Sequence, residues 1–160
     1  MKVIKDNNIV EDSWQYIEEV SEELPTGDLI VPFDYWLEKQ SELNQHDGQI
    51  AVSINGAVET EQVAEHLERF QLIALEFPVF ADGRSYSHAR LLRDRYAYRG
   101  ELRAVGDVLR DQLFYMKRCG IDSFALRRDK DFNDALKAFK EFSVTYQNAA
   151  DGAMPIYKVR

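Results

Sequence analysis

The sequence predicts an α/β fold, a parallel sheet of four to five strands built from βα repeats. Short apolar segments alternate with amphipathic segments of helical period, and the clear strands start near residues 49, 72, 101 and 122. The segment Leu72–Phe77 is almost continuously apolar, as is typical of a parallel strand buried on both faces. Strands that follow in chain order produce a partial (βα) barrel or an open sheet, and we expect an open or partly curled sheet.

The individual elements follow from apolar spacing and from residues that break the chain. A weaker first unit is expected in the strand Leu29–Val31, closed by Pro32, and the helix Phe33–Leu43. The later strands are predicted at Gln49–Ile54, Leu72–Phe77, Glu101–Val105 and Asp122–Leu126. The later helices are predicted at Glu59–Phe70, Ser85–Tyr96, Val108–Cys119 and from Asp131 to about Tyr146. Gly120 is expected in the left-handed position that ends a helix.

Length and composition indicate one domain over residues 1–160. Residues 1–28 are expected to be an irregular acidic segment and residues 148–160 a loosely packed tail. The single cysteine, Cys119, excludes a disulfide within one chain, and no apolar stretch reaches the roughly 18 residues of a membrane helix. The beginning of the chain lacks the apolar run of a signal peptide. We therefore expect a cytoplasmic protein that does not bind membranes.

Charge is distributed unevenly along the chain. Residues 1–80 contain 17 acidic and 4 basic residues, a net −13, whereas residues 81–160 contain 11 acidic and 16 basic residues, a net +5. The overall charge of −8 disfavours duplex nucleic acid, whose binding depends on neutralising phosphates. The basic half is rich in arginine, which suits oxyanions or the acidic surface of a partner. Alternatively, these arginines pair with acids of the first half.

The best candidate site is the edge where parallel strands end and helices begin, since ligands of α/β folds bind there. Loops at three strand ends carry arginines, and helix N-termini add a partial positive charge. The expected anion- or partner-binding residues are Asp82, Gly83, Arg84, Arg103, Asp107, Arg110, Asp111 and Arg127. Structural roles compete with this interpretation: Asp82-Gly83 forms a turn, Asp107 caps a helix and Asp111 orients an arginine. Glu76, in a buried strand, would pair with Arg103.

Known catalytic and cofactor patterns are missing from the sequence. His46, His66 and His88 lack metal-ligand spacing and are expected at the surface. No nucleophile elbow, dinucleotide fingerprint or nucleotide-triphosphate loop occurs. The catalytic residues stay unknown, and we predict no metal or cofactor, although a flavin binds in some proteins without a short motif. Phe114 and Tyr115 point away from the apolar face of their helix and are candidates for a partner surface.

The segments FADGRSYSHARLLR (Phe80–Arg93), GELRAVGDVLRDQL (Gly100–Leu113) and RCG (Arg118–Gly120) resemble an uncharacterised bacterial family. Members of that family are labelled oxidoreductases involved in sulfite reduction and are encoded among sulfite reduction genes. The resemblance implies a place in sulfur assimilation and a partner such as sulfite reductase or its electron donor.

Three functions are therefore compatible with the sequence. The first is an accessory protein of assimilatory sulfite reduction that docks an acidic redox partner or a small oxyanion on the arginine-rich edge. The second is an oxidoreductase with a non-covalently bound flavin, and the third is an enzyme acting on a small anionic substrate. A homodimer that completes a barrel is a further possibility.

Overall fold

The computed structural model describes residues 2–19, 23–77, 83–108, 110–125 and 137. Within them, eight strands form one sheet in the order β2-β1-β8-β7-β6-β5-β4-β3. The strands are β1 (Lys2–Lys5), β2 (Asn8–Glu11), β3 (Gln15–Tyr16), β4 (Leu29–Pro32), β5 (Ile50–Ile54), β6 (Leu72–Phe77), β7 (Glu101–Gly106) and β8 (Ser123–Phe124). Strands β3 to β8 are parallel, whereas β1 pairs antiparallel with both β8 and β2. The predicted sheet of four to five parallel strands was therefore too small, and the real sheet is mixed.

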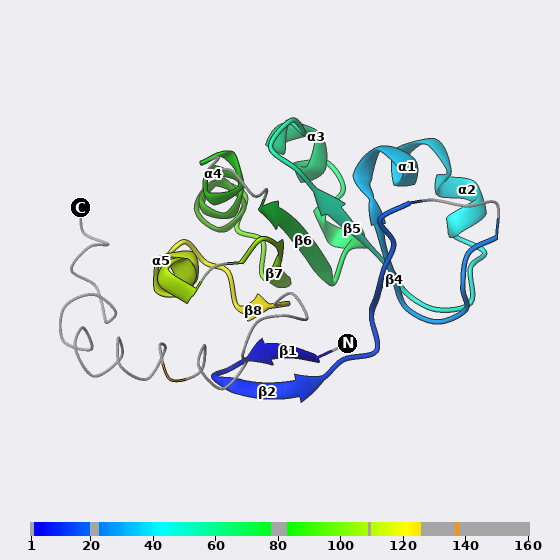
Figure 1. Ribbon diagram of the computed structural model, residues 1–160. Coiled ribbons are helices and arrows are strands. Elements are labelled where there is room, and N and C mark those ends of the chain that lie inside the picture. Colours follow the sequence, from blue (N-terminus) through cyan, green and yellow to red (C-terminus); the bar gives the residue numbers. More distant parts are fainter. Residues whose placement is uncertain (1, 20–22, 78–82, 109, 126–136, 138–160) are drawn as a thin grey trace.

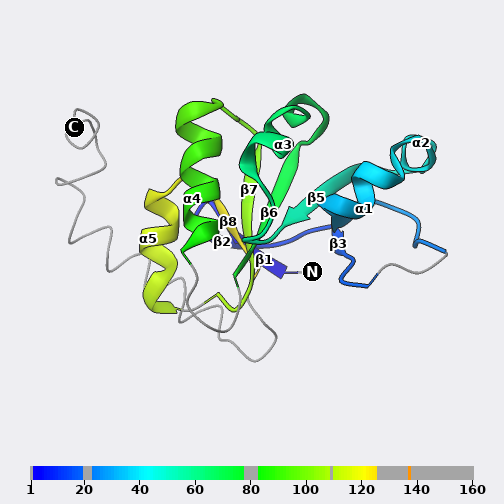
Figure 2. The ribbon, with the colours of Figure 1, turned by 90° about the horizontal axis from the view of Figure 1, so that it is seen from above.

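The helices cover the side of the parallel strands that faces away from the β1–β2 hairpin, which continues the sheet past β8 (Figure 1). They are α1 (Phe33–Glu38), α2 (Gln40–Leu43), α3 (Thr60–Ala64), the 3-10 turn η1 (Leu67–Arg69), α4 (Arg84–Arg90), its π-helical continuation η2 (Leu91–Arg95), the 3-10 turn η3 (Arg110–Gln112) and α5 (Leu113–Arg118). Helices α4 and α5 lie side by side (Figure 2). The helix predicted from Asp131 and the tail 148–160 lie outside the described residues.

The sheet is strongly curled, and chain connectivity explains why. Strand β2 ends at Glu11 and β3 begins at Gln15, so residues 12–14 alone join the two opposite edges of the sheet. Seven inter-strand spacings would separate these edges by about 34 Å if the sheet were flat, whereas four Cα steps span at most about 15 Å. The sheet therefore forms a curled half-barrel, and the predicted partial barrel is confirmed in that form.

The two faces of the curled sheet have different cores. On the outer face, larger apolar side chains such as Ile73, Leu75 and Leu102 pack beneath the helices. On the inner face, a smaller cluster includes Ala51 and Ala74 and is covered by partly buried aromatic side chains. Small side chains suit this face, because the segment that crosses between β2 and β3 must fit inside the curl. The inner face is thus a packed interior.

The irregular N-terminal segment predicted for residues 1–28 contains strands β1, β2 and β3. Strands β1 and β2 form a hairpin around Asp6 and Asn7, whose φ angles are 53° and 62°. Two consecutive positive φ angles are those of a type I′ turn, which favours asparagine and aspartate. The Asp6-Asn7 pair between two short apolar segments was the signal in the sequence that could have revealed this hairpin.

Arg93 holds together the amino-terminal end of the sheet. Its Nε donates to the Gly120 carbonyl at 2.9 Å, and its Nη1 donates to the carbonyls of Tyr98 and Gly100, each at 2.8 Å. Gly120 has the predicted left-handed conformation, with φ of 107°. Arg93 also pairs with Asp122 at 3.3 Å, so this arginine of the basic half has a structural role.

Candidate functional site

The predicted site edge lies at the carboxyl-terminal ends of the parallel strands. Phe77 of β6 is paired with Gly106 of β7, so the connections that follow these two strands are neighbours. The described part of the edge contains Gly83 and Arg84 at the start of α4, Asp107 directly after β7, and Arg110 and Asp111 in η3. Gly83, Arg84 and Asp111 are exposed, whereas Asp107 is half-buried. Asp82 and Arg127 lie outside the described residues, as does the side chain of Arg110.

Gly106 shapes this edge through a close backbone contact. Its φ is 92°, and a Cβ atom at this position would lie 2.5 Å from the Phe77 carbonyl oxygen. That oxygen accepts a hydrogen bond from the Asp107 amide at 2.8 Å. A glycine is therefore required for the chain to turn away from β7 while remaining bonded to β6.

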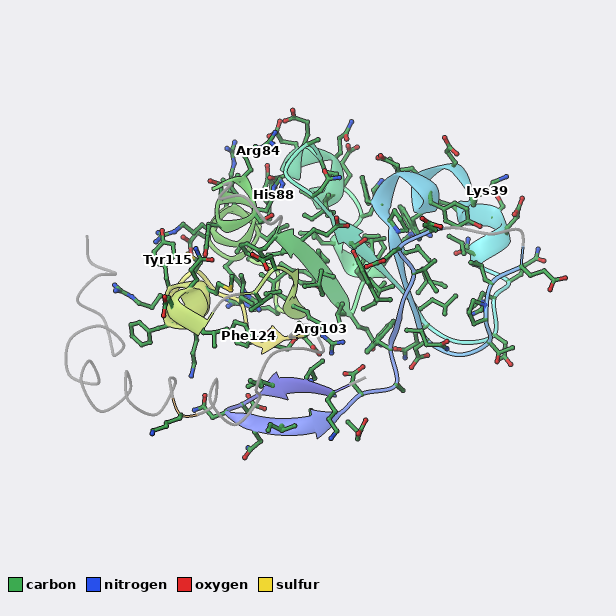
Figure 3. All side chains as sticks on the ribbon, viewed as in Figure 1. Lys39, Arg84, His88, Arg103, Tyr115 and Phe124 are labelled. Carbon is green, nitrogen blue, oxygen red and sulfur yellow. The ribbon has the colours of Figure 1, made fainter. Side chains whose placement is uncertain are left out.

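Arg103 does not belong to the edge, which corrects the prediction made from the sequence. It lies in the middle of β7 with its side chain completely buried on the inner face, between the sheet and the β1–β2 hairpin (Figure 3). Its Nη2 donates to Asp12 at 2.6 Å and to Glu101 at 2.7 Å, while its Nε donates to the Ser123 hydroxyl at 3.1 Å. The charge of Arg103 is thus offset inside the fold.

The polar network around Arg103 extends to the hairpin. Lys5 of β1 pairs with Glu101 at 3.0 Å, and Ser123 donates to Glu101 at 2.6 Å. Two carboxylates and two cations therefore balance one another where the curled sheet closes. Arg103 Nη1 is also buried, and none of the described residues offers it a hydrogen-bond partner. The crossing segment supplies Asp12, so this partner of Arg103 comes from 91 positions away in the chain.

The network lowers the pKa of Glu101. Burial alone would raise this pKa, but the Ser123 hydroxyl, the Arg103 guanidinium and the Lys5 ammonium together bring it below its ordinary value of 4.5. A carboxyl group whose pKa is lowered by folding stabilises the folded state when the pH is above the group's ordinary pKa. This stabilisation is lost as the pH falls through the lower pKa of the folded state.

We therefore expect Glu101→Gln to destabilise the protein in a pH-dependent manner. At pH 7 the free energy of unfolding of the variant is lower than that of the original protein by about 2–4 kcal/mol, because Arg103 keeps fewer buried charge partners. The difference should shrink below pH 4.5, where protonated glutamic acid resembles glutamine. Urea unfolding at several pH values measures it, and a difference that is constant with pH would contradict the network.

Glu76 does not pair with Arg103, contrary to the expectation from the sequence. It is half-buried on β6, and its charge acts on Tyr16 of β3. Burial, followed by the negative charge of Glu76, raises the pKa of the Tyr16 hydroxyl well above its ordinary value of 10.0. The hydroxyl therefore stays protonated.

His88 was expected at the surface, but it is buried. Its Nε2 donates to the Asn55 carbonyl at 3.0 Å, and its Nδ1 is 2.7 Å from the Thr60 hydroxyl. Since a carbonyl only accepts, Nε2 carries the proton of the hydrogen bond to Asn55. His88 thus ties α4 to the start of α3 and to the end of β5, a structural role.

An arginine-rich aromatic surface lies on α4 and α5. Tyr115 is 46% exposed, and its ring centroid is 4.9 Å from that of Tyr86. The guanidinium of Arg90 lies over the Tyr115 ring at 5.8 Å, and that of Arg118 lies over Phe114 at 6.0 Å. We call these five residues the α4–α5 face. It includes both aromatic residues that the sequence singled out as a partner surface.

The described residues contain neither a cluster suited to a metal ion nor a helix suited to a membrane. No group of three or more histidine, cysteine, aspartate or glutamate side chains in this part of the chain is arranged to hold a metal ion. No helix in it has the length and apolar character needed to cross a membrane.

Residues 51–157 match the model of a family described as bacterial protein of unknown function (DUF934). The chain belongs to this family. The match bears out the resemblance to an uncharacterised bacterial family, whereas the link to sulfite reduction stays a prediction. The DUF934 range begins in β5 and contains Arg103 and the α4–α5 face, while Asp12 precedes it. No curated protein matches the chain.

Proposed function

We propose that the protein is an accessory component of assimilatory sulfite reduction that docks an acidic redox partner through its exposed cations. The observation that carries this proposal is the separation of exposed charge along the helical layer. Exposed cations of α4, η2 and α5 are Arg84, Arg90, Arg95, Lys117 and Arg118, and the exposed acids among and next to them are Asp94 and Asp111. Exposed acids on and next to α1, α2, α3 and η1 are Asp34, Glu38, Glu42, Glu59, Glu61, Glu65 and Glu68, and the exposed cations there are Lys39 and Arg69, so each side keeps a net charge of its own sign. Such a charge pattern steers a negatively charged partner toward one end of the helical layer.

An acidic protein fits these cations better than a small oxyanion does. Arg103, which was expected to complete an oxyanion site, is neutralised by Asp12 and Glu101. The exposed cations are instead spread over two neighbouring helices, which suits a broad surface. The pathway rests on the resemblance of residues 80–120, which lie within the range matched by the family.

Reversing the charge of Arg84 tests the proposal. We expect Arg84→Glu to reduce capture of purified sulfite reductase, or of its electron donor, by about fivefold to tenfold at low salt. The matched control is Arg99→Glu, because Arg99 is an exposed arginine that precedes β7 at the opposite end of the sheet. Equal capture by the two variants, or no capture by the original chain, would contradict the docking function.

A further inference from the structure

We propose that the α4–α5 face is the place where an acidic protein docks, and that Tyr115 and Arg90 are its anchors. This inference rests on the proposed function and specifies its surface, which lies on the helices instead of on the loop edge predicted from the sequence. Arg84 and Tyr115 both lie on the helical side of the molecule, whereas Arg103 lies on the opposite side of the sheet (Figure 3).

The anchor is rigidly supported from the core. The Phe77 ring on β6 is buried and lies 5.0 Å from Tyr86 on α4, which in turn lies 4.9 Å from Tyr115 on α5. Burial raises the pKa of Tyr86 to about 12, with smaller contributions from Cys119 and Tyr115, so this ring remains neutral. Three rings in edge-to-face and tilted contact therefore lead from the sheet to the surface, and little side-chain entropy is lost when a partner covers the last of them.

The exposure of Tyr115 and the residue types around it indicate that this ring is a contact point. Tyr115 is the large hydrophobic residue that stands out as exposed in the described part of the chain. A single exposed aromatic is ordinary on a protein surface. Here, however, Arg90 lies over it and Phe114 with Arg118 forms a second such pair on the same helix. Tyrosine and arginine are the residues most enriched at energetically important positions of protein interfaces.

Charge decides the class of partner. Arg90, Lys117 and Arg118 are exposed around Tyr115, and Arg84 and Arg95 extend the positive region along α4 and η2. The net charge of −8 opposes polyanions in general, so the choice between them rests on the local surface, where the cations surround an exposed tyrosine ring. An acidic protein surface with an apolar centre complements both the cations and the tyrosine ring.

The first test uses a probe that is independent of the pathway. The full chain is titrated with a random copolymer of glutamate and tyrosine, and binding is followed by calorimetry. We expect Tyr115→Ala to weaken binding about tenfold, whereas Tyr115→Phe, which keeps the ring, stays within about twofold. Unchanged binding by Tyr115→Ala overturns the proposal. If this variant unfolds, Arg90→Gln replaces it under the same expectation.

The second test separates the surface from the proposed function by capture of purified sulfite reductase. Loss of capture in Tyr115→Ala supports both the α4–α5 face as the docking surface and the proposed docking function. Normal capture by Tyr115→Ala together with loss in Arg84→Glu overturns the surface and leaves the docking function in place. Copolymer binding that depends on Tyr115, without any capture of sulfite reductase or of its electron donor, supports the surface and overturns the proposed function. Self-association that Tyr115→Ala abolishes would identify a second copy as the occupant and overturn the acidic partner.

Discussion

Arg103→Met is expected to lower the free energy of unfolding by about 3–5 kcal/mol. The substitution leaves Asp12 and Glu101 inside the curled sheet without the guanidinium that binds both of them, at 2.6 and 2.7 Å. Removing one member of a buried charge network is costly, because Asp12 and Glu101 stay largely desolvated and lose the cation that binds both of them. Urea unfolding followed by circular dichroism measures the change.

The control for this prediction is Arg99→Met, which removes the same charge from an exposed position before β7. A surface substitution of this kind is expected to change stability by less than about 0.5 kcal/mol. If Arg103→Met were as mild as the control, the network would not stabilise the contact between the crossing segment and β7.

Gly106→Ala is expected to destabilise the protein by about 2–4 kcal/mol. Two costs combine, because the φ of 92° is unfavourable for any residue with a Cβ and because that Cβ would meet the Phe77 carbonyl oxygen at 2.5 Å. The obstacle is backbone of the neighbouring strand, so relief requires β6 and β7 to separate where they end. Thermal unfolding measures the loss.

Gly83→Ala is the matched control at the same edge. Gly83 has a φ of −75°, and no atom lies within 4 Å of a Cβ built at this position. We expect this substitution to be neutral or to stabilise the protein by up to about 1 kcal/mol, since alanine restricts the unfolded chain. Equal losses in the two variants would show that the edge does not depend on the conformation of Gly106.

The repeated βα units were predictable because each carries its own local signal. Strand β6 has the predicted bounds, and β4, β5 and β7 match their predicted segments to within a residue at each end. Apolar runs flanked by glycine or proline explain this agreement. Strand β3 has two residues, and β1 pairs with β8 through residues 118 and 120 positions apart, so neither could be recognised from periodicity. Long-range pairing decides those elements.

The candidate site was less accessible to sequence reasoning. Residue type alone does not distinguish the buried Arg103 from the exposed arginines. Nothing near Arg103 in the chain indicates that Asp12 crosses back to meet it. His88 lies three residues after Ser85 and four before Leu92, on the buried face of its helix, so its spacing indicated burial although its polar side chain suggested the surface. Its partners Asn55 and Thr60 are supplied by a different βα unit. Tyr115, in contrast, was singled out correctly as exposed, because the apolar stripe of its own helix lies on another side. Local periodicity predicts exposure better than it predicts polar partners.

The most direct test of the docking account is the salt dependence of binding between the full chain and purified sulfite reductase. We expect the dissociation constant to rise steeply between about 0.05 and 0.5 M salt, because the exposed cations of α4 and α5 steer an acidic partner. Arg84→Glu should flatten this dependence, and Arg99→Glu should retain it. Binding that is independent of salt in all three proteins, or the absence of binding at low salt, would contradict the account.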